Sequence, residues 1–254
     1  MTIALSVNLN KIALIRNSRM GNYPDVVAHG RVCLEAGAHG LTVHPRPDQR
    51  HIRATDIAPL AALVHEFAGA EFNIEGNPFA AHFGSYPGLL ALAESSRPHQ
   101  CTLVPDANQQ LTSDHGFDLR ADGGRLQPII RQLQEWGVRV SLFMDPDLEQ
   151  IRLAKQLGAD RIELYTGPFA EAFSQRKTDL DKLYGHYVDA AELALELGLG
   201  VNAGHDLNLE NMALFRGLPG LQEVSIGHAL TVDALRLGLT NTVKAYLALC
   251  QSPA

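Results

Sequence analysis

Several short apolar runs of the chain contain or end in a polar side chain that can transfer a proton. Histidine ends such runs at His44 and His205, and glutamate ends or interrupts them at Glu75 and Glu163. An imidazole exchanges a proton near neutral pH, and a carboxyl group held away from water has its pKa raised toward the same range. These side chains would suit a reaction with several proton transfers, such as imine formation, elimination and aldol-type ring closure.

Basic residues cluster early in a chain that is acidic overall. Arginine forks and histidines suit a phosphate group, and Arg46 and His51 follow closely after the run that ends at His44. Glycine precedes both His205 and His228, which allows a phosphate to approach the backbone closely. The sequence thus predicts a substrate that carries phosphate. The early basic residues are Lys11, Arg16, Arg19, Arg46, Arg50, His51 and Arg53.

The same side chains leave two alternatives open. His44 and Glu75, like the two later histidines, are possible metal ligands, so a metal-dependent hydrolase or lyase acting on a phosphorylated small molecule is one alternative. Against a metal, the first apolar run carries Asn8 and Asn10, where such barrel hydrolases usually offer His-x-His. A protein that binds a phosphate ligand without turnover is the other alternative. The chain contains no Walker sequence and no dinucleotide fingerprint.

The elements that would position these groups alternate between strand and helix. Eight apolar runs are separated by amphipathic stretches, several of which end in glycine as short capped loops do. Eight parallel strands can close into a barrel whose carboxyl ends meet on one face, the usual place of an active site in that fold. We therefore predict a (β/α)8 barrel in one domain, residues 1–254. The predicted strands span 4–10, 39–45, 71–75, 100–106, 139–145, 161–167, 199–205 and 223–229.

The connections between the predicted strands differ in character. Thr55 is expected to be the N-cap of the helix after the second strand. The longest polar stretch, residues 107–124, leads from the fourth strand to its helix, and further helices are expected over residues 209–217 and 234–249.

Composition limits the kinds of partner. With 21 Lys and Arg against 28 Asp and Glu, the formal net charge is -7, which argues against nonspecific binding to nucleic acid. No apolar stretch approaches the ~18 residues of a membrane span, and the first residues match a strand better than a signal peptide. Cys33, Cys101 and Cys250 lie far apart without CxxC spacing and are expected to be reduced. We therefore expect a cytoplasmic protein that binds neither nucleic acid nor membrane.

Eight segments spread over essentially the whole chain are together more selective than any single catalytic triplet. They are VNLNKIALIRNSR, TVHPRPDQRHI, FNIEGNP, PHQCTLVPD, VSLFMDPD, ADRIELYTGPFA, VNAGHDLN and VSIGHAL. In order and spacing they closely resemble the pyridoxine 5′-phosphate synthase family of the deoxyxylulose-phosphate-dependent route to vitamin B6. The resemblance implies a (β/α)8 barrel with extra helices that assembles as a homo-octamer. It also implies condensation of 1-deoxy-D-xylulose 5-phosphate with 3-amino-2-oxopropyl phosphate, giving pyridoxine 5′-phosphate, phosphate and water without a metal or organic cofactor.

The resemblance further implies roles for individual residues. His44 and Glu75 would accept protons, His205 would donate one, and Glu163 would support the transition state. Two further groups would hold the substrates. The residues for 3-amino-2-oxopropyl phosphate would be Asn8, Arg19, Asp206, Gly227 and His228. The residues for 1-deoxy-D-xylulose 5-phosphate would be Arg46, His51 and Thr112, the last in a loop that closes over the site in this family.

The chain departs from the family pattern at two places. Many members have Asp-His where this chain has Asn10 and Lys11, which leaves the part played by this pair open. A lysine attracts a phosphate or carbonyl oxygen, but it exchanges protons near neutral pH only if its pKa is strongly lowered. Asp206 stands where other members have glycine, so its contact with the substrate is expected to be through the backbone.

Overall fold

The computed structural model describes residues 2–107 and 109–251, which form a closed barrel of eight parallel strands. Each strand pairs with the next along the chain, and the last pairs with the first. The predicted (β/α)8 barrel is confirmed. The strands are β1 (Ala4–Asn8), β2 (Gly40–Val43), β3 (Glu71–Gly76), β4 (Gln100–Leu103), β5 (Arg139–Met144), β6 (Arg161–Tyr165), β7 (Gly200–Gly204) and β8 (Leu221–Ile226).

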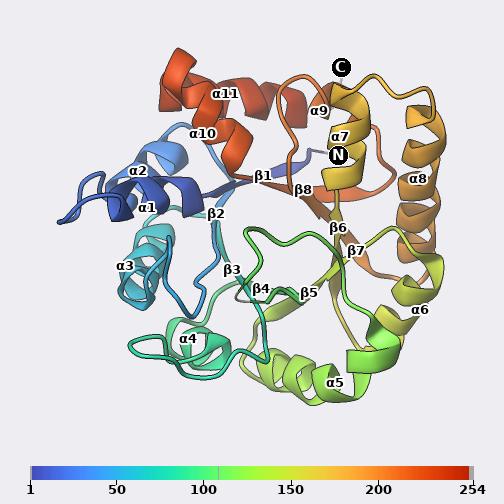
Figure 1. The fold of residues 1–254 in the computed structure, drawn as a ribbon, viewed down its shortest axis with the longest axis horizontal. Helices are drawn as coiled ribbons and strands as arrows, with labels where there is room; N and C mark the ends of the chain where they lie inside the picture. The colour runs from blue at the N-terminus through green and yellow to red at the C-terminus, as the bar shows by residue number, and fades with distance from the viewer. Residues whose placement is uncertain (1, 108, 252–254) are drawn as a thin grey trace.

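Helices surround this barrel, as Figure 1 shows. Two helices, rather than one, follow each of β1, β6 and β8, so the extra helices are present. The helices of the described residues are α1 (Asn10–Asn17), α2 (Val26–Glu35), α3 (Ala54–His65), α4 (Leu89–Ser96), α5 (Leu119–Glu135), α6 (Leu148–Leu157), α7 (Gly167–Ser174), α8 (Leu180–Glu196), α9 (Met212–Phe215), α10 (His228–Leu237) and α11 (Leu239–Cys250).

Acidic side chains begin several of these helices. Asp25 caps α2 and Asp147 caps α6, because each carboxylate accepts backbone N–H groups of the first helical turn. The prediction that Thr55 caps α3 was wrong. That helix begins after Arg53, whose backbone N–H donates to Asp56 Oδ2 at 2.8 Å, so the carboxylate rather than the threonine hydroxyl stabilises its first turn.

Three elements also differ from prediction in where they begin or end. The first strand stops at Asn8, because Asn8 Oδ1 accepts the backbone N–H of Asn10 at 2.9 Å and turns the chain into α1. The helix predicted over residues 234–249 is broken at Gly238, whose φ of 75° no helix interior can contain. The helix predicted over residues 209–217 shortens to the single turn of α9.

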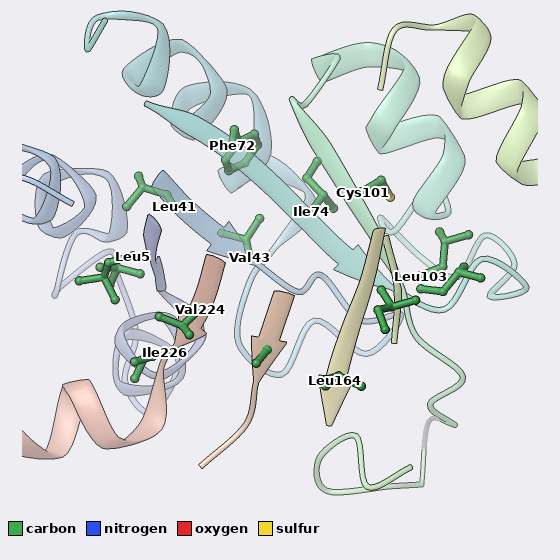
Figure 2. Packing of buried hydrophobic residues seen from close by; sticks show 14 of the residues in the cluster. Leu5, Leu41, Val43, Phe72, Ile74, Cys101, Leu103, Leu164, Val224 and Ile226 are labelled. Carbon is green, nitrogen blue, oxygen red and sulfur yellow. The ribbon is translucent and has the colours of Figure 1, made fainter. Parts of the chain in front are cut away.

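The strands present two different faces. Outward side chains such as Leu41 are apolar and buried in the main hydrophobic cluster of the protein, part of which Figure 2 shows. Inward side chains are polar and bond to one another between neighbouring strands: Ser6 Oγ lies 2.6 Å from Thr42 Oγ1, and Thr102 Oγ1 donates to Asn73 Oδ1 at 3.2 Å. The hydrophobic core therefore lies between strands and helices, whereas the barrel interior is hydrophilic.

Two expectations from composition concern the state of the cysteines and the presence of membrane-spanning helices. Cys33, Cys101 and Cys250 are buried free thiols, and burial raises the pKa of each to about 12. Among the residues described, none of the helices combines the length and the apolar character needed to cross a membrane.

Candidate active site

A cavity of about 300 Å³ opens at the carboxyl ends of the strands. Every catalytic or substrate-binding residue predicted from the sequence lines it, with the exception of Arg19. Its lining residues are Asn8, Asn10, Lys11, His44, Arg46, His51, Glu75, Leu111, Thr112, Ser113, Glu163, His205, Asp206, Ser225, Gly227 and His228.

His44 lies between two carboxylates. Its Nδ1 is 3.8 Å from Glu75 Oε2, and its Nε2 is 3.1 Å from Asp106 Oδ2. The backbone N–H of His44 donates to Asn10 Oδ1 at 2.9 Å, which ties the end of β2 to the start of α1. The side chain is 5% exposed, so its position is set by these neighbours rather than by water.

Glu75 is a buried carboxyl with weak hydrogen-bond support. Ser225 Oγ donates to Glu75 Oε1 at 3.4 Å, and Asn8 Nδ2 donates to Glu75 Oε2 at 3.5 Å. Burial raises the pKa of Glu75 well above its ordinary value, and the nearby Glu163 raises it further. A carboxylate whose pKa is raised in this way is a stronger base than an ordinary glutamate.

Glu163 points into the barrel interior, as its position inside an apolar run predicts. Thr102 Oγ1 donates to Glu163 Oε2 at 3.3 Å. Burial, with a smaller effect from the charge of Glu223, raises the pKa of Glu163 to about 8. At neutral pH this side chain is therefore mostly a neutral carboxylic acid, which can donate a hydrogen bond.

His205 is held by rings and by an unusual backbone. Its imidazole packs against Phe143 and Tyr165, with ring centroids 4.9 and 5.5 Å away. Its φ of 81° is one that side-chain-bearing residues rarely adopt, and Thr166 Oγ1 donates to its carbonyl oxygen. Burial and the neighbouring His44 lower the pKa of His205 to about 4, so the ring is neutral at pH 7.

Another part of the cavity lining is suited to a phosphate. Helix α10 begins at His228, and its first amides have no partners within the helix and carry the positive end of its dipole. A Cβ on Gly227 would stand 3.0 Å from the Cβ of Asn8, so glycine keeps this corner open. Asp206 also lines the cavity, and its carbonyl oxygen accepts from Asn211 Nδ2 at 3.0 Å.

The early basic residues divide into two groups. Arg46, His51 and Lys11 line the cavity, whereas Arg16 is buried away from it in a two-pronged pair with Asp56, at 2.6 and 2.9 Å. Burial, then the charge of His44, lowers the pKa of His51 to about 3. His51 is therefore a neutral hydrogen-bonding group at pH 7.

Arg19 is the predicted binding residue that the fold does not bring to the cavity. It follows α1, is exposed, and donates its backbone N–H to Arg16 O at 3.3 Å. Its role therefore stays a prediction from the resemblance.

The loop between β4 and α5 completes one wall. Figure 1 shows this green segment passing across the ring of strands. Thr112 lines the cavity from this loop, and the loop is tied down where Arg46 Nη1 and Arg50 Nη1 each donate to Gln110 O at 2.8 Å.

Sequence reasoning missed one buried carboxylate. Asp106 follows β4 and is 5% exposed. Its Oδ2 lies 2.5 Å from Arg46 Nη2. The signal was present, because the run QCTLVPD ends in this aspartate just as neighbouring runs end in His44 and Glu75.

As for metals, the described part of the chain contains no group of three or more His, Cys, Asp or Glu side chains that could hold an ion.

Comparison with known proteins adds information on ancestry. A family model described as "Pyridoxal phosphate biosynthesis protein PdxJ" matches residues 5–252. Two curated relatives carry the name pyridoxine 5′-phosphate synthase. The one from Xanthomonas campestris pv. campestris (strain B100) is 56% identical over 250 residues, covering 98% of this chain and 96% of the relative. The one from Xylella fastidiosa (strain 9a5c) is 53% identical over 249 residues, covering 98% and 95%.

Solved structures support the fold. Tryptophan synthase from M. tuberculosis matches with a TM-score of 0.63 at 12% identity, covering 98% of this chain and 94% of that one. The 3-hexulose-6-phosphate synthase from Salmonella typhimurium matches with a TM-score of 0.62 at 15% identity, covering 98% of both. At such low identity these matches bear on the barrel alone.

Proposed function

This chain belongs to the PdxJ family of pyridoxal phosphate biosynthesis proteins, and we infer that it is a pyridoxine 5′-phosphate synthase. In this function it condenses 3-amino-2-oxopropyl phosphate with 1-deoxy-D-xylulose 5-phosphate, giving pyridoxine 5′-phosphate, inorganic phosphate and water. The observation that carries the proposal is a single cavity that holds four acid–base side chains beside groups suited to phosphate.

The reaction needs repeated proton transfers. An amine must attack a carbonyl, carbon must lose protons for the ring to close, and hydroxyl and phosphate groups must leave. We assign the proton-acceptor roles to His44 and Glu75, whose nearest ring nitrogen and carboxyl oxygen are 3.8 Å apart. A proton taken up by one of them could be passed to the other through a small shift.

The proton-donor role falls to His205, and substrate binding explains how it acquires its proton. Burial and the nearby His44 keep this ring neutral, since they lower its pKa to about 4. A phosphate dianion bound beside it would favour the imidazolium form by charge attraction. His205 therefore becomes a competent acid when the substrate arrives. Glu163, a neutral acid at pH 7, donates a hydrogen bond to oxygen on which charge develops in the transition state.

The two substrates occupy different parts of the cavity in this proposal. We assign the amino-ketone phosphate to the α10 side, and the ketose phosphate to the loop side. The first set is Asn8, Asp206, Gly227 and His228, with Asp206 acting through its backbone, and the resemblance adds Arg19, which follows α1 outside the lining of the cavity. The second set is Arg46, His51 and Thr112.

Three broader expectations belong to the same proposal. The resemblance supports a cytoplasmic homo-octamer that needs no metal or organic cofactor. Mass measurement in solution by light scattering tests the octamer, and turnover after exhaustive chelation tests the independence from metal.

The decisive experiment supplies the purified protein with both phosphates. We expect pyridoxine 5′-phosphate, separated by chromatography, and inorganic phosphate in equal amounts, with neither formed when one substrate is omitted. Absence of product at micromolar protein would exclude the proposed function. Binding of both phosphates without turnover would instead support the alternative of a binding protein.

A further inference from the structure

Asp106 has no role in the reaction as described so far. It follows β4, lies outside the set of residues that line the cavity, and contacts two residues within that set. Its side chain is almost completely buried, which is rare for a carboxylate without a specific partner.

The contacts of Asp106 converge on one atom. Its Oδ2 lies 3.1 Å from His44 Nε2 and 2.5 Å from Arg46 Nη2. The other ring nitrogen of His44 faces Glu75, so the imidazole lies with one edge toward each carboxylate. A rotation of the His44 ring would therefore disrupt its contacts with Asp106 and with Glu75 together.

Charge makes this contact specific. Burial alone would raise the pKa of the Asp106 carboxyl, but His44 and Arg46 outweigh burial and hold its pKa below the ordinary value. The group is therefore an anion at neutral pH. It supplies the counter-charge that the buried Arg46 guanidinium requires.

One anchor of the surrounding chain does not involve this carboxylate. Asn77 Nδ2 donates to the backbone oxygen of Asp106 at 2.7 Å, and the following loop is tied by the Arg46 bond to Gln110 O at 2.8 Å. A change confined to the Asp106 side chain leaves the first anchor in place. Its effects can therefore be separated from a general loss of structure.

We infer that Asp106 is a positioning residue for the synthase reaction: its Oδ2 aligns the Arg46 guanidinium with the ketose phosphate and fixes the His44 ring toward Glu75. The inference rests on the proposed function. A residue of this kind acts on the binding of one substrate and on the chemical step, but not on the binding of the other substrate.

The test is the steady-state kinetics of Asp106→Asn and Asp106→Glu against both substrates. For Asp106→Asn we expect the KM for 1-deoxy-D-xylulose 5-phosphate to rise about tenfold and kcat to fall about tenfold, on the usual scale of groups that orient active-site residues. The KM for 3-amino-2-oxopropyl phosphate should change less than about twofold. Asp106→Glu keeps the charge and should recover most of the loss.

A matched control is Asp145→Asn. Asp145 follows the neighbouring strand β5, and its Oδ2 accepts the backbone N–H of Gly116 at 3.1 Å, so it also anchors the β4–α5 loop without lining the cavity. We expect its kinetics to stay within about twofold of the unmodified protein, because an amide oxygen can still accept that bond. Circular dichroism and thermal melting establish that each variant is folded.

Several outcomes would overturn the inference. Equal rises in both KM values, an Asp106→Glu variant as impaired as Asp106→Asn, or unchanged kinetics in Asp106→Asn would each contradict it. If Asp106→Asn does not fold, the comparison of the two KM values is made on Asp106→Glu alone, where a smaller rise confined to the ketose phosphate is expected. Absence of turnover by the unmodified protein would overturn the proposed function, and the inference with it.

Discussion

Glu163 Oε1 occupies the space in which a Cβ on Gly204 would stand. The two residues are on neighbouring strands, where Glu163 pairs with Asn202 and Tyr165 with Gly204. Gly204 has ordinary strand geometry and does not need glycine for its own backbone. The absence of a side chain at this position is what lets the glutamate carboxyl lie at the floor of the cavity.

Substituting Gly204→Ala should therefore impair catalysis. The added methyl group displaces the Glu163 carboxyl, and we expect kcat to fall by roughly 10- to 100-fold with little change in either KM. Gly124→Ala is the matched control, since nothing lies within 4 Å of its would-be Cβ and it is on the exposed face of α5. That change should leave kcat unaltered and stabilise the helix by about 0.5–1 kcal/mol. Equal activity of the two variants in a steady-state assay would contradict the steric argument.

The raised pKa of Glu163 makes the stability of the protein depend on pH. Its pKa is about 8 in the folded chain against an ordinary 4.5, so between these values the folded protein keeps a proton that the unfolded chain has released. The free energy of unfolding therefore falls as pH rises from 4.5 to 8, and this contribution is constant above that range.

Glu163→Gln removes this contribution. Relative to the unmodified protein, the variant should gain on the order of 3 kcal/mol in free energy of unfolding between pH 5 and pH 8.5. The measured difference also includes the loss of the Glu163 contribution to the raised pKa of Glu75. Urea unfolding followed by circular dichroism at several pH values measures it, and parallel pH profiles for the two proteins would argue against a protonated Glu163.

Phosphate binding should drive proton uptake by His205. The pKa of about 4 leaves the ring neutral at pH 6, and a bound anion favours the imidazolium. Calorimetry of inorganic phosphate binding at pH 6, in buffers that differ in ionisation enthalpy, should show more proton uptake by the unmodified protein than by His205→Asn. Identical uptake by the two proteins would remove the basis for substrate-induced protonation.

Asn10 should matter as an acceptor rather than as an acid. Its Oδ1 receives the backbone N–H of His44, a bond that aspartate can also make but alanine cannot. Asn10→Asp should keep kcat/KM within a few-fold of the unmodified protein, whereas Asn10→Ala should lower it about tenfold or more by freeing the end of β2. An equal fall in kcat/KM in both variants would show that Asn10 does not act by accepting this hydrogen bond.

Much of the barrel and its site was predictable because parallel strands that are buried on both faces follow a simple sequence pattern. A polar residue at the end of a buried run has to leave the core, and in a closed parallel barrel all such residues leave at the same end. His44, Glu75 and His205 were found in this way. Glu163 was predicted to face inward because it interrupts its apolar run. The hydrogen bond that Thr102 donates to it explains how the barrel interior holds this carboxyl group.

What could not be predicted depends on contacts between residues distant in sequence. The start of α1 depends on the Asn8 side chain, and the start of α3 on Asp56, neither of which follows from helix propensity. The part that Asp106 plays depends on its two partners on the β2 side, His44 and Arg46, which no local pattern indicates. The position of Arg19 follows from the path of the chain beyond α1, which local patterns do not determine.

The alternation of polar and apolar residues along the strands separates two kinds of evolutionary change. Outward positions such as Val43 and Ile74 determine how firmly the helices are held, while inward positions such as Thr42 and Asn73 determine the chemistry of the interior. Substitutions on the outer face can therefore adjust thermal tolerance and leave the reaction alone. A one-residue insertion within a strand would instead change both faces together. It would turn carboxylates toward the helices and aliphatic side chains toward the substrates.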